Sequence, residues 1–492
     1  MFHYTLYIQG GTLSMDYKRG QWGSNFGFLM AAVGSAVGLG NIVGFPYKMG
    51  KNGGFAFLAI YLILTALVGI VIMLGELAIG RKTGKGIMGA YLSFSKKYAW
   101  LGFLGVLAGL LILSFYCVLG GMVTRYMVGY LMQILGMEGF AGQGSNFLEY
   151  LLYDYDSMLL YFFLFMAVTV AIVMGGIDKG IEKFASVAMP ALFFILLFII
   201  VYIAFQPGAA AGYSFMFKPD FSVFSDPEIG FWGVFKAAAG QMFFSLSLGI
   251  GCMITYGSYL SKNENLQKNT IIIPLADTII ALMSGMAVMP ACAAFGVAYN
   301  KGPVLLFVSL QTIFENMGTF GNLIGFMFYF LVFIASVTSS ISLLELCTTF
   351  QIDLAISKGK NPNRKKISCM FALLALILGL PAALDALGSG NALIPAPFEL
   401  LGYKMGEAGY AMWNDSWYDF YDLIAEGIVM PLGALSLSVL IGWVWKTEII
   451  KNECELSGNR FIGYKYYNFC FKFVVPIILS LIFYAQLLDF FG

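Results

Sequence analysis

The sequence has few charged side chains and a single histidine. Aspartate, glutamate, lysine and arginine make up 11% of the 492 residues, whereas 59% of the residues are hydrophobic. Soluble domains carry about 25% charged residues, so a chain this long with so few of them cannot cover a surface that faces water. Most of the chain must therefore face lipid, and the composition predicts a membrane protein.

Other scarce features exclude further classes of protein. The net charge is only +1, so nothing in the composition favours nucleic acid as a partner. The seven cysteines lack CxxC spacing and lie mostly in apolar runs, which is typical of small buried side chains. The sequence contains no histidine cluster, nucleophile motif or phosphate-binding loop, so an enzyme is not expected.

The only histidine, His3, lies in an N-terminal segment of unusual composition. Residues 1–14 have neither the basic start of a signal peptide nor an apolar run long enough for a membrane anchor. Met15 is followed by Asp-Tyr-Lys-Arg, which is typical of a cytoplasmic segment before a first span. We therefore expect translation to start at Met15, which would leave the working protein without histidine and would exclude histidine proton relays and metal sites.

Apolar segments of membrane-spanning length recur along the whole chain. A membrane helix needs about 20 mostly apolar residues. Eleven segments meet this length, at residues 25–49, 54–79, 99–134, 158–176, 183–205, 232–258, 269–298, 320–352, 366–387, 417–445 and 465–490. The predicted fold class is an all-α polytopic membrane protein with 11 transmembrane helices.

Basic residues predict the orientation of these helices. Lysine and arginine gather in alternate loops, as at Arg81-Lys82, Lys96-Lys97 and Arg364–Lys366. Such loops face the cytoplasm, so we expect a cytoplasmic N-terminus and, with an odd number of spans, an extracellular C-terminus in the plasma membrane.

Two spans contain sequences that do not suit a continuous helix. Span 1 reads Gly34-Ser35-Ala36-Val37-Gly38-Leu39-Gly40-Asn41, and span 6 reads Ser245-Leu246-Ser247-Leu248-Gly249-Ile250-Gly251. One explanation is close helix packing through small residues. The other is an interrupted helix, which lipid tolerates only where the broken backbone is buried or lines a cavity. Two interruptions five spans apart favour the inverted repeats of secondary transporters, whose freed carbonyls bind cations and whose helix N-termini bind carboxylates.

This organisation divides the chain into predicted units. They are a cytoplasmic N-terminus (1–24, with 1–14 expected to precede the native start), a first five-helix repeat (25–205), an extracellular loop (206–231), a second five-helix repeat (232–445), and a loop with the peripheral helix 11 (446–492).

At the two interruptions the sequence resembles the neurotransmitter:sodium symporter family, over about residues 19–490. The motifs that carry the resemblance are Gly34–Asn41 followed by Phe45-Pro46, Asn52-Gly53-Gly54, Gly240–Ser247 and Thr338-Ser339-Ser340. The eleven-span bacterial amino-acid branch is the most similar. The resemblance implies a sodium-coupled symporter of α-amino acids that works by alternating access between the two sides of the lipid bilayer.

The resemblance implies two sodium sites. The first would use Ala36, Asn41, Ser245 and Asp277, and the second Gly34, Val37, Ala335, Thr338 and Ser339. If Thr338-Ser339-Ser340 is considered apart from span 1, its hydroxyls could instead donate hydrogen bonds to carbonyls of their own helix. Chloride-dependent members have a neutral residue where this chain has Asp277 and bind the anion beside residues that resemble Tyr61, Gln241 and Ser245. We therefore expect transport without chloride, because an intramembrane carboxylate is functional by default.

The resemblance also implies a substrate pocket between spans 1, 3, 6 and 8. Its expected lining is Ser35, Ala36, Leu39, Gly40, Ile112, Tyr116, Phe244, Ser245, Ser247, Ile250, Ser339 and Leu343. Monoamine carriers have an aspartate where this chain has Gly38, so the substrate is expected to bring its own carboxylate. The apolar side chains indicate neutral, hydrophobic amino acids.

Gate residues follow from the same resemblance, with one departure. Arg19 and Asp353 resemble the inner pair, with Tyr259 close by, and Asp422 resembles the outer carboxylate. The arginine expected before Phe45-Pro46 is Gly44 here, so Lys48 or Lys51 would replace it, or aromatic packing alone would close the outer side. The spacing from Gly180 to Pro190 resembles a feature that lets span 5 unwind, and we expect the carboxylates of Glu76 and Glu345 to join helix-packing networks.

Two alternatives remain open. A proton-coupled amino-acid transporter of the same architecture would lack the second sodium site, and Thr338 and Ser339 argue against it. A transporter-like sensor would need no competent gates, and the missing arginine keeps this alternative open. The sequence assigns neither the exact substrate nor the number of coupled ions nor the oligomeric state.

Overall fold

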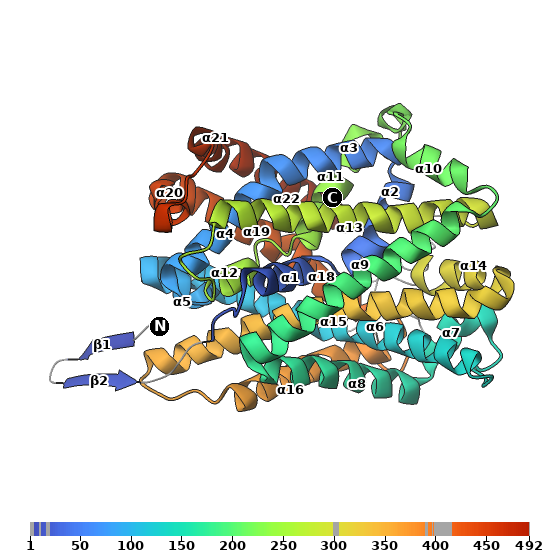
Figure 1. Cartoon of the computed structure of the whole chain (residues 1–492), viewed down its shortest axis with the longest axis horizontal. Coiled ribbons are helices and arrows are strands. Elements are labelled where there is room, and N and C mark those ends of the chain that lie inside the picture. The colour runs from blue at the N-terminus through green and yellow to red at the C-terminus, as the bar shows by residue number, and fades with distance from the viewer. Residues whose placement is uncertain are drawn as a thin grey trace.

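The structure is a computed structural model that describes residues 4–8, 11–15, 20–298, 305–388, 392–395, 397 and 416–491. Within these residues the chain is helical except for an antiparallel hairpin of β1 (Tyr4–Ile8) and β2 (Gly11–Met15). The hairpin departs from the all-α prediction, because Tyr4–Ile8 is rich in aromatic and β-branched residues that favour strands. It lies in the segment expected to precede the native start and projects from one end of the helical bundle (Figure 1).

The predicted membrane spans correspond to helices of the structure. Nine helices in the described part of the chain are long and apolar enough to cross a membrane. They are α3–α4 (Phe55–Thr83), α6 with its preceding turn (Lys96–Ile134), α8 (Tyr155–Met174), α9 with its preceding turn (Ile177–Ala204), α13 (Leu266–Phe295), α15 (Gly321–Ser357), α16 (Arg364–Leu384), α18–α19 and the following turn (Trp417–Val444), and α21–α22 (Tyr464–Ala485).

Two further segments of the described chain are discontinuous; the first makes a tenth candidate span, and the predicted eleven are reached only if the second is also counted as one span. Span 1 consists of α1 (Asn25–Ala36), a π-helical turn (Gly40–Gly44) and α2 (Phe45–Lys51), with a bend of 54° at the break. Span 6 consists of α11 (Gly230–Ser245) and α12 (Cys252–Gly257), separated by six residues without regular helical structure. Both predicted interruptions are therefore present.

The backbone of span 6 leaves the helix at residues with left-handed dihedral angles. Ser247, Gly249 and Gly251 have φ values of 51°, 87° and 85°. Glycine adopts such angles without steric penalty, and serine does so at a modest cost. The left-handed angles at Gly249 and Gly251 therefore turn the chain away from the axis of α11 before it enters α12.

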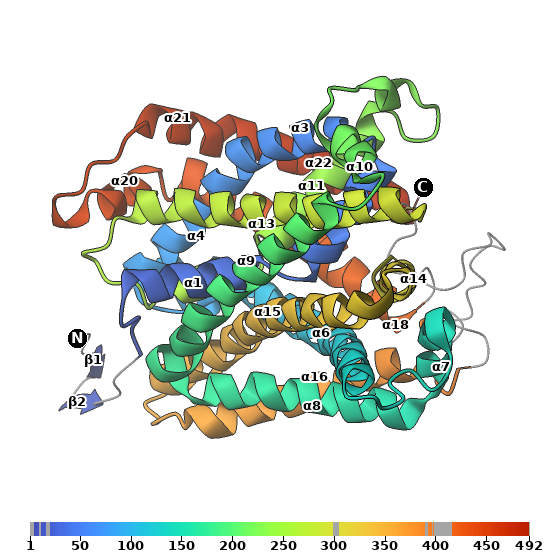
Figure 2. The ribbon, with the colours of Figure 1, turned by 45° about the vertical axis from the view of Figure 1, so that its right-hand side comes forward.

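The longest helices form the centre of the molecule. α6 packs along α15, and α8 and α16 cover one side of this pair (Figure 2). Side chains on the outside of the bundle are apolar, such as Val187 at 70%, Phe194 at 65% and Leu160 at 61% exposure. Such large apolar surfaces require lipid rather than water around the helices.

Short helices lie at the two ends of the bundle. α5 (Ile87–Phe94) and α20 (Glu448–Cys454) lie at the end that carries the hairpin, and α7 (Phe147–Tyr153), α10 (Ala209–Phe217) and α14 (Leu310–Asn316) at the opposite end (Figure 1). The predicted loop 206–231 thus contains a helix. Most of the chain between α16 and α18 lies outside the described residues.

Candidate functional site

A cavity lies where the breaks of spans 1 and 6 meet α6 and α15. Its lining is Ser35, Ala36, Gly38, Gly40, Ile112, Tyr116, Phe244, Ser247, Ile250, Ser339, Ser342, Leu343 and Met430. The lining combines backbone and hydroxyl groups from the two breaks with apolar side chains from four helices. It contains no charged side chain among the described residues.

Most of the predicted pocket residues surround this cavity. Leu39 and Ser245 do not: Leu39 lines the pocket on the other side of Tyr116, and Ser245 is directed to Asp277. The sequence prediction did not include Ser342 and Met430 in the pocket. It considered Gly38 only as the position where monoamine carriers have an aspartate, and not as part of the lining. Ser342 lies three residues after Ser339 on the same helix, so helical spacing could have indicated it.

Polar groups of the cavity connect the broken spans. The backbone N–H of Leu39 donates to the hydroxyl of Tyr116 at 3.2 Å, and the hydroxyl of Ser247 donates to the carbonyl of Ser35 at 3.2 Å. Among the described residues, the hydroxyl of Ser35 is buried without a hydrogen-bond partner. A buried polar group without a partner is unfavourable, so the cavity suits a ligand that offers a donor or acceptor to Ser35.

Asn41, Ser245 and Asp277, predicted for the first sodium site, form one buried cluster. The Asn41 amide nitrogen donates to Asp277 Oδ1 at 2.7 Å and to Ser245 Oγ at 2.9 Å, and Ser245 Oγ donates to Asp277 Oδ2 at 2.8 Å. Tyr61 also donates to Asp277, at 3.3 Å. The fourth predicted ligand, Ala36, lies at the end of α1 and lines the cavity.

The charge of Asp277 is not balanced by a basic side chain. Asp277 is 0% exposed, and within the described part of the chain no lysine, arginine or histidine forms an ion pair with it. An isolated buried carboxylate is strongly unfavourable unless a cation accompanies it or it takes up a proton. Carboxylate, amide and hydroxyl oxygens are ligands for hard cations, so the cluster fits a sodium ion.

The residues predicted for the second sodium site lie between α1 and α15. Ser339 Oγ donates to the carbonyl of Val37 at 3.3 Å, and a Cβ atom added to Gly34 would lie 3.0 Å from Thr338 Cβ. The Thr338 hydroxyl donates to the carbonyls of Ala335, at 2.9 Å, and Ile334. This back-bonding occupies the hydroxyl proton, and the oxygen lone pairs of Thr338 remain able to accept a cation.

Comparisons with known proteins agree with this geometry. The profile of the sodium:neurotransmitter symporter family matches residues 19–139 and 152–392, which include both broken spans and all residues predicted for the sodium sites. The chain belongs to this family of symporters. The sodium-dependent transporter YhdH of Bacillus subtilis is 34% identical over 95% of this chain and 98% of its own length, and a sodium-dependent transporter of Haemophilus influenzae is 32% identical over 96% and 98%.

A solved structure shows the same architecture. The crystal structure of MhsT in complex with L-phenylalanine is 35% identical, with a TM-score of 0.80, and the match covers 95% of this chain and 100% of MhsT. Membership of the family makes this chain a multi-pass membrane protein and a sodium-dependent symporter rather than an enzyme.

In this symporter a glutamate supports the break of span 6. The carboxylate of Glu76, in α4, accepts a hydrogen bond from the backbone N–H of Gly249 at 2.7 Å. Glu76 is 1% exposed, so its carboxylate is enclosed by protein. The carboxylate thus satisfies a backbone donor that the missing helix leaves free.

Two adjoining pockets, which we call the vestibule, lie between the cavity and the end that carries α10 and α14. Tyr47, Lys48, Phe244, Asp422 and Glu426 line both pockets. Tyr116 and Phe244 line the cavity as well, so these two rings separate it from the vestibule. Glu426, which the sequence prediction missed, follows Asp422 by one helical turn.

Lys48 is the basic residue of this symporter that faces the predicted gate carboxylate. Its charge acts on both Glu426 and Asp422, although no direct ion pair within 4.0 Å joins the three in the described structure. Lys51 is exposed to solvent at the end of α2. A Cβ atom added to Gly44 would lie 3.3 Å from Gln241 Oε1, so the position of the missing arginine borders the same vestibule.

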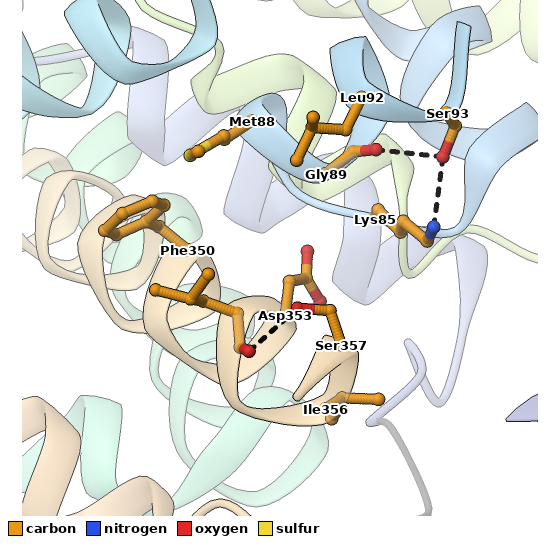
Figure 3. A pocket seen from close by; sticks show the side chains of 10 residues that line it. Lys85, Met88, Gly89, Leu92, Ser93, Phe350, Asp353, Ile356 and Ser357 are labelled. Carbon is orange, nitrogen blue, oxygen red and sulfur yellow. Dashed lines mark hydrogen bonds between the residues drawn. The ribbon is translucent and has the colours of Figure 1, made fainter. Parts of the chain in front are cut away.

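The predicted inner gate is described only in part. Arg19 lies outside the described residues. Asp353 lines a pocket between α5 and the end of α15, opposite Lys85 (Figure 3), and its carboxylate accepts from the N–H of Gly86 at 2.7 Å. Tyr259 donates to Glu345 at 2.7 Å, and Glu345 forms an ion pair with Arg364.

Other contacts close this end of the symporter and were not predicted. The Trp22 indole donates to the carbonyl of Tyr256 at 3.0 Å and packs against the rings of Tyr256 and Tyr259. Glu182, in the π-helical turn before α9, accepts from the N–H of Gly23 at 2.6 Å and from the hydroxyl of Ser24 at 2.8 Å. The start of span 1 is therefore fixed to spans 5 and 6.

Proposed function

We propose that this symporter carries neutral, hydrophobic α-amino acids together with sodium and without chloride. The observation that carries the proposal is the composition of the cavity, in which backbone groups and hydroxyls from two broken helices face apolar side chains and no charged one. MhsT, whose structure contains L-phenylalanine, supports the substrate class because it matches nearly the whole chain.

The space around Gly38 favours amino acids over amines. A Cβ atom at Gly38 would lie 2.7 Å from Ser339 Oγ and 2.8 Å from the Tyr116 hydroxyl, so the position has no room for a carboxylate side chain. The two carboxylates next to the breaks in the described structure are already engaged, Asp277 by Asn41 and Ser245 and Glu76 by the N–H of Gly249. A substrate carboxylate would meet the Tyr116 hydroxyl and the start of the second half of span 1, where free N–H groups favour an anion.

Sodium in the first site would change the hydrogen bonds of Asn41. In the described structure the amide nitrogen faces Asp277, and the amide oxygen accepts from the N–H of Gly38 at 3.1 Å. A cation between Asn41, Ser245 and Asp277 requires the amide oxygen to face it, which a rotation of the amide by about 180° achieves. The substrate carboxylate would complete the coordination, so substrate and ion would bind together.

The second site would couple the closure of the cytoplasmic side to sodium. Gly34 belongs to α1 and Val37 directly follows its last residue, whereas Thr338 and Ser339 belong to α15. An ion bound by oxygens of both helices would hold α1 against α15, and its release would let α1 move away. Met189, next to Pro190 in α9, lies against Gly34, so unwinding of this helix would give water a path to the ion.

The charge of Asp277 supports independence of chloride. In the described residues Tyr61, Ser245 and Asp277 occupy one hydrogen-bonded cluster, so the carboxylate stands where chloride-dependent relatives are expected to hold the anion. An anion beside this carboxylate would suffer repulsion of like charges in a site of low dielectric constant.

We propose that this symporter lies in the plasma membrane, with its N-terminus in the cytoplasm and its C-terminus outside the cell. The access paths then alternate between the vestibule, closed by Tyr116, Phe244 and the charges around Lys48, and the opposite side, closed by Trp22 and Glu182.

Binding of an amino-acid panel to the purified protein tests the proposal. Leucine, phenylalanine, tryptophan, glycine, glutamate, lysine and dopamine are measured in sodium chloride, sodium gluconate and potassium chloride. We expect saturable binding of the hydrophobic amino acids in both sodium salts and none in potassium. Binding that requires chloride, or preference for a charged amino acid or an amine, would contradict the proposal.

A further inference from the structure

We infer that Met430 sets the size of the amino-acid side chain that the cavity accepts, an inference that rests on the proposed function. Met430 is 2% exposed and belongs to span 10, which the resemblance did not assign to the substrate pocket. It lines the cavity together with Ile112, Ile250 and Leu343. It is thus an additional apolar side chain at the substrate.

The backbone of Met430 is fixed by direct contact with the break of span 6. A Cβ atom added to Gly249 would lie 2.1 Å from the carbonyl oxygen of Met430, and one added to Gly433 would lie 2.2 Å from the carbonyl oxygen of Gly249. Gly249 is itself held by its hydrogen bond to Glu76 at 2.7 Å. The two backbones therefore meet without side chains between them, and a larger ligand cannot be accommodated by moving span 10 away from span 6 alone.

The side chain of Met430 has the freedom that its backbone lacks. Methionine is unbranched and has three rotatable bonds, so it fills irregular space and adapts to differently shaped neighbours. Met430 begins α19 directly after a π-helical turn (Leu423–Val429), a local geometry that often occurs at functional sites. Met430 lines the vestibule as well as the cavity, so it lies at the boundary between them.

These contacts give Met430 a role in size selection rather than in charge selection. A bulky substrate side chain would displace the thioether toward the vestibule, and a small one would leave it in the cavity. The polar side chains of the cavity, among them Ser35, Tyr116 and Ser339, lie on other spans and are not altered by this movement. Changing the volume at position 430 should therefore change the ranking of apolar amino acids.

Competition binding with variants of Met430 tests this inference. Valine, leucine, phenylalanine and tryptophan compete with a labelled amino acid for the wild type, Met430→Ala, Met430→Phe and Met430→Leu in sodium. We expect the ratio of tryptophan to valine affinity to rise about tenfold in Met430→Ala and to fall about tenfold in Met430→Phe. A difference of one or a few methylene groups in an apolar pocket changes the affinity for a ligand by a factor of about this size. Met430→Leu, which keeps the volume, should leave the ratio within about twofold.

Leu437→Ala is the matched control. Leu437 is 1% exposed on the same helix, and the cavity lining does not include it. Its truncation should lower stability without changing the ratio. If Met430→Ala does not fold, Met430→Phe against Met430→Leu still gives the comparison.

The outcomes separate the inference from the proposed function. Failure of the wild type to bind any amino acid would contradict the proposed function. Wild-type binding with an unchanged affinity ratio in Met430→Ala and Met430→Phe would overturn the inference alone. The same conclusion would follow if these variants weakened all four amino acids equally, because Met430 would then affect closure of the cavity rather than its size.

Discussion

The amide of Asn41, in the broken part of span 1, donates a hydrogen bond of 2.7 Å to the carboxylate of Asp277 in α13. This bond joins the irregular backbone of span 1 to the only buried carboxylate in the described part of the cluster, and Ser245 at the end of α11 completes the group. Three elements thus meet at one negative charge, where a cation can influence the breaks of both spans.

Asp277→Asn should weaken sodium binding and introduce a dependence on chloride. The substitution removes the negative charge that would attract the ion and leaves a neutral side chain of the same shape. We expect the sodium concentration for half-maximal amino-acid binding to rise at least about tenfold, which corresponds to about 1.4 kcal/mol. Chloride should restore part of the loss.

Titration of sodium in chloride and gluconate salts measures this effect. Asp156→Asn is the control, because Asp156 is exposed in the first turn of α8. Unchanged sodium dependence in Asp277→Asn would remove this carboxylate from the ion site.

Thr338→Val should lower sodium affinity through the second site. Valine keeps the shape of threonine but lacks the hydroxyl oxygen expected to bind the ion. Loss of one ligand should raise the half-saturating sodium concentration roughly fivefold, in line with about 1 kcal/mol for one polar contact.

Thr270→Val is a matched control for this substitution. Thr270 is 1% exposed, and like Thr338 its hydroxyl donates to its own helix, at 2.8 Å to the carbonyl of Leu266. If both variants changed the sodium affinity equally, the effect of Thr338→Val would come from the lost hydrogen bond to its own helix rather than from lost sodium coordination.

Lys48→Gln should speed the loss of bound substrate toward the vestibule. The substitution removes the positive charge that acts on Asp422 and Glu426, so span 1 would no longer be attracted to these two carboxylates of span 10 when the vestibule closes. We expect a dissociation rate about fivefold higher, which corresponds to about 1 kcal/mol. Lys218→Gln should leave the rate unchanged, because Lys218 is exposed and is not among the described residues that line the vestibule. Chase of labelled substrate from detergent-purified protein gives both rates, and equal rates for the two variants would exclude Lys48 as the gate cation.

Gly249→Ala should destabilise the protein, whereas Gly240→Ala should not. A methyl group at Gly249 would meet the carbonyl of Met430 at 2.1 Å and would sit on a backbone with a φ of 87°. The left-handed backbone alone costs about 1–3 kcal/mol for a residue other than glycine, and the backbone clash adds to it. A Cβ atom at Gly240 would meet nothing within 4 Å, and alanine in a helix is favoured over glycine by about 0.5–1 kcal/mol. The temperature of thermal unfolding in detergent should therefore be lower for Gly249→Ala than for the wild type, and unchanged or higher for Gly240→Ala. The reverse order would contradict the described contact of spans 6 and 10.

The parts of the fold that local sequence determines could be predicted. The nine continuous spans of the described chain follow from apolar length, and both breaks follow from glycine and serine placed at mid-span. Asp277 stands out because a carboxylate inside a membrane span needs a partner. These features depend on residues that are neighbours in the chain, so the sequence contains their signal directly.

Contacts between distant segments could not be predicted in the same way. Glu182 binds Gly23 across 159 residues, and Met430 reaches the cavity from a span without a recognisable pocket motif. Glu426 had a weak signal, because it follows Asp422 by one helical turn on the same face. Glu345 joined a packing network as expected, but its partner Arg364 belongs to the next helix and became evident only in the folded chain.

Uptake of labelled amino acid into proteoliposomes tests sodium coupling most directly. The purified protein is reconstituted, and uptake of leucine or phenylalanine is followed under an inward sodium gradient, under an inward proton gradient in potassium, and without a gradient. The account predicts accumulation above equilibrium with the sodium gradient alone, in chloride and in gluconate equally. Accumulation that depends on the proton gradient and not on sodium would contradict sodium coupling. So would the absence of accumulation under every gradient, if the same protein binds amino acids.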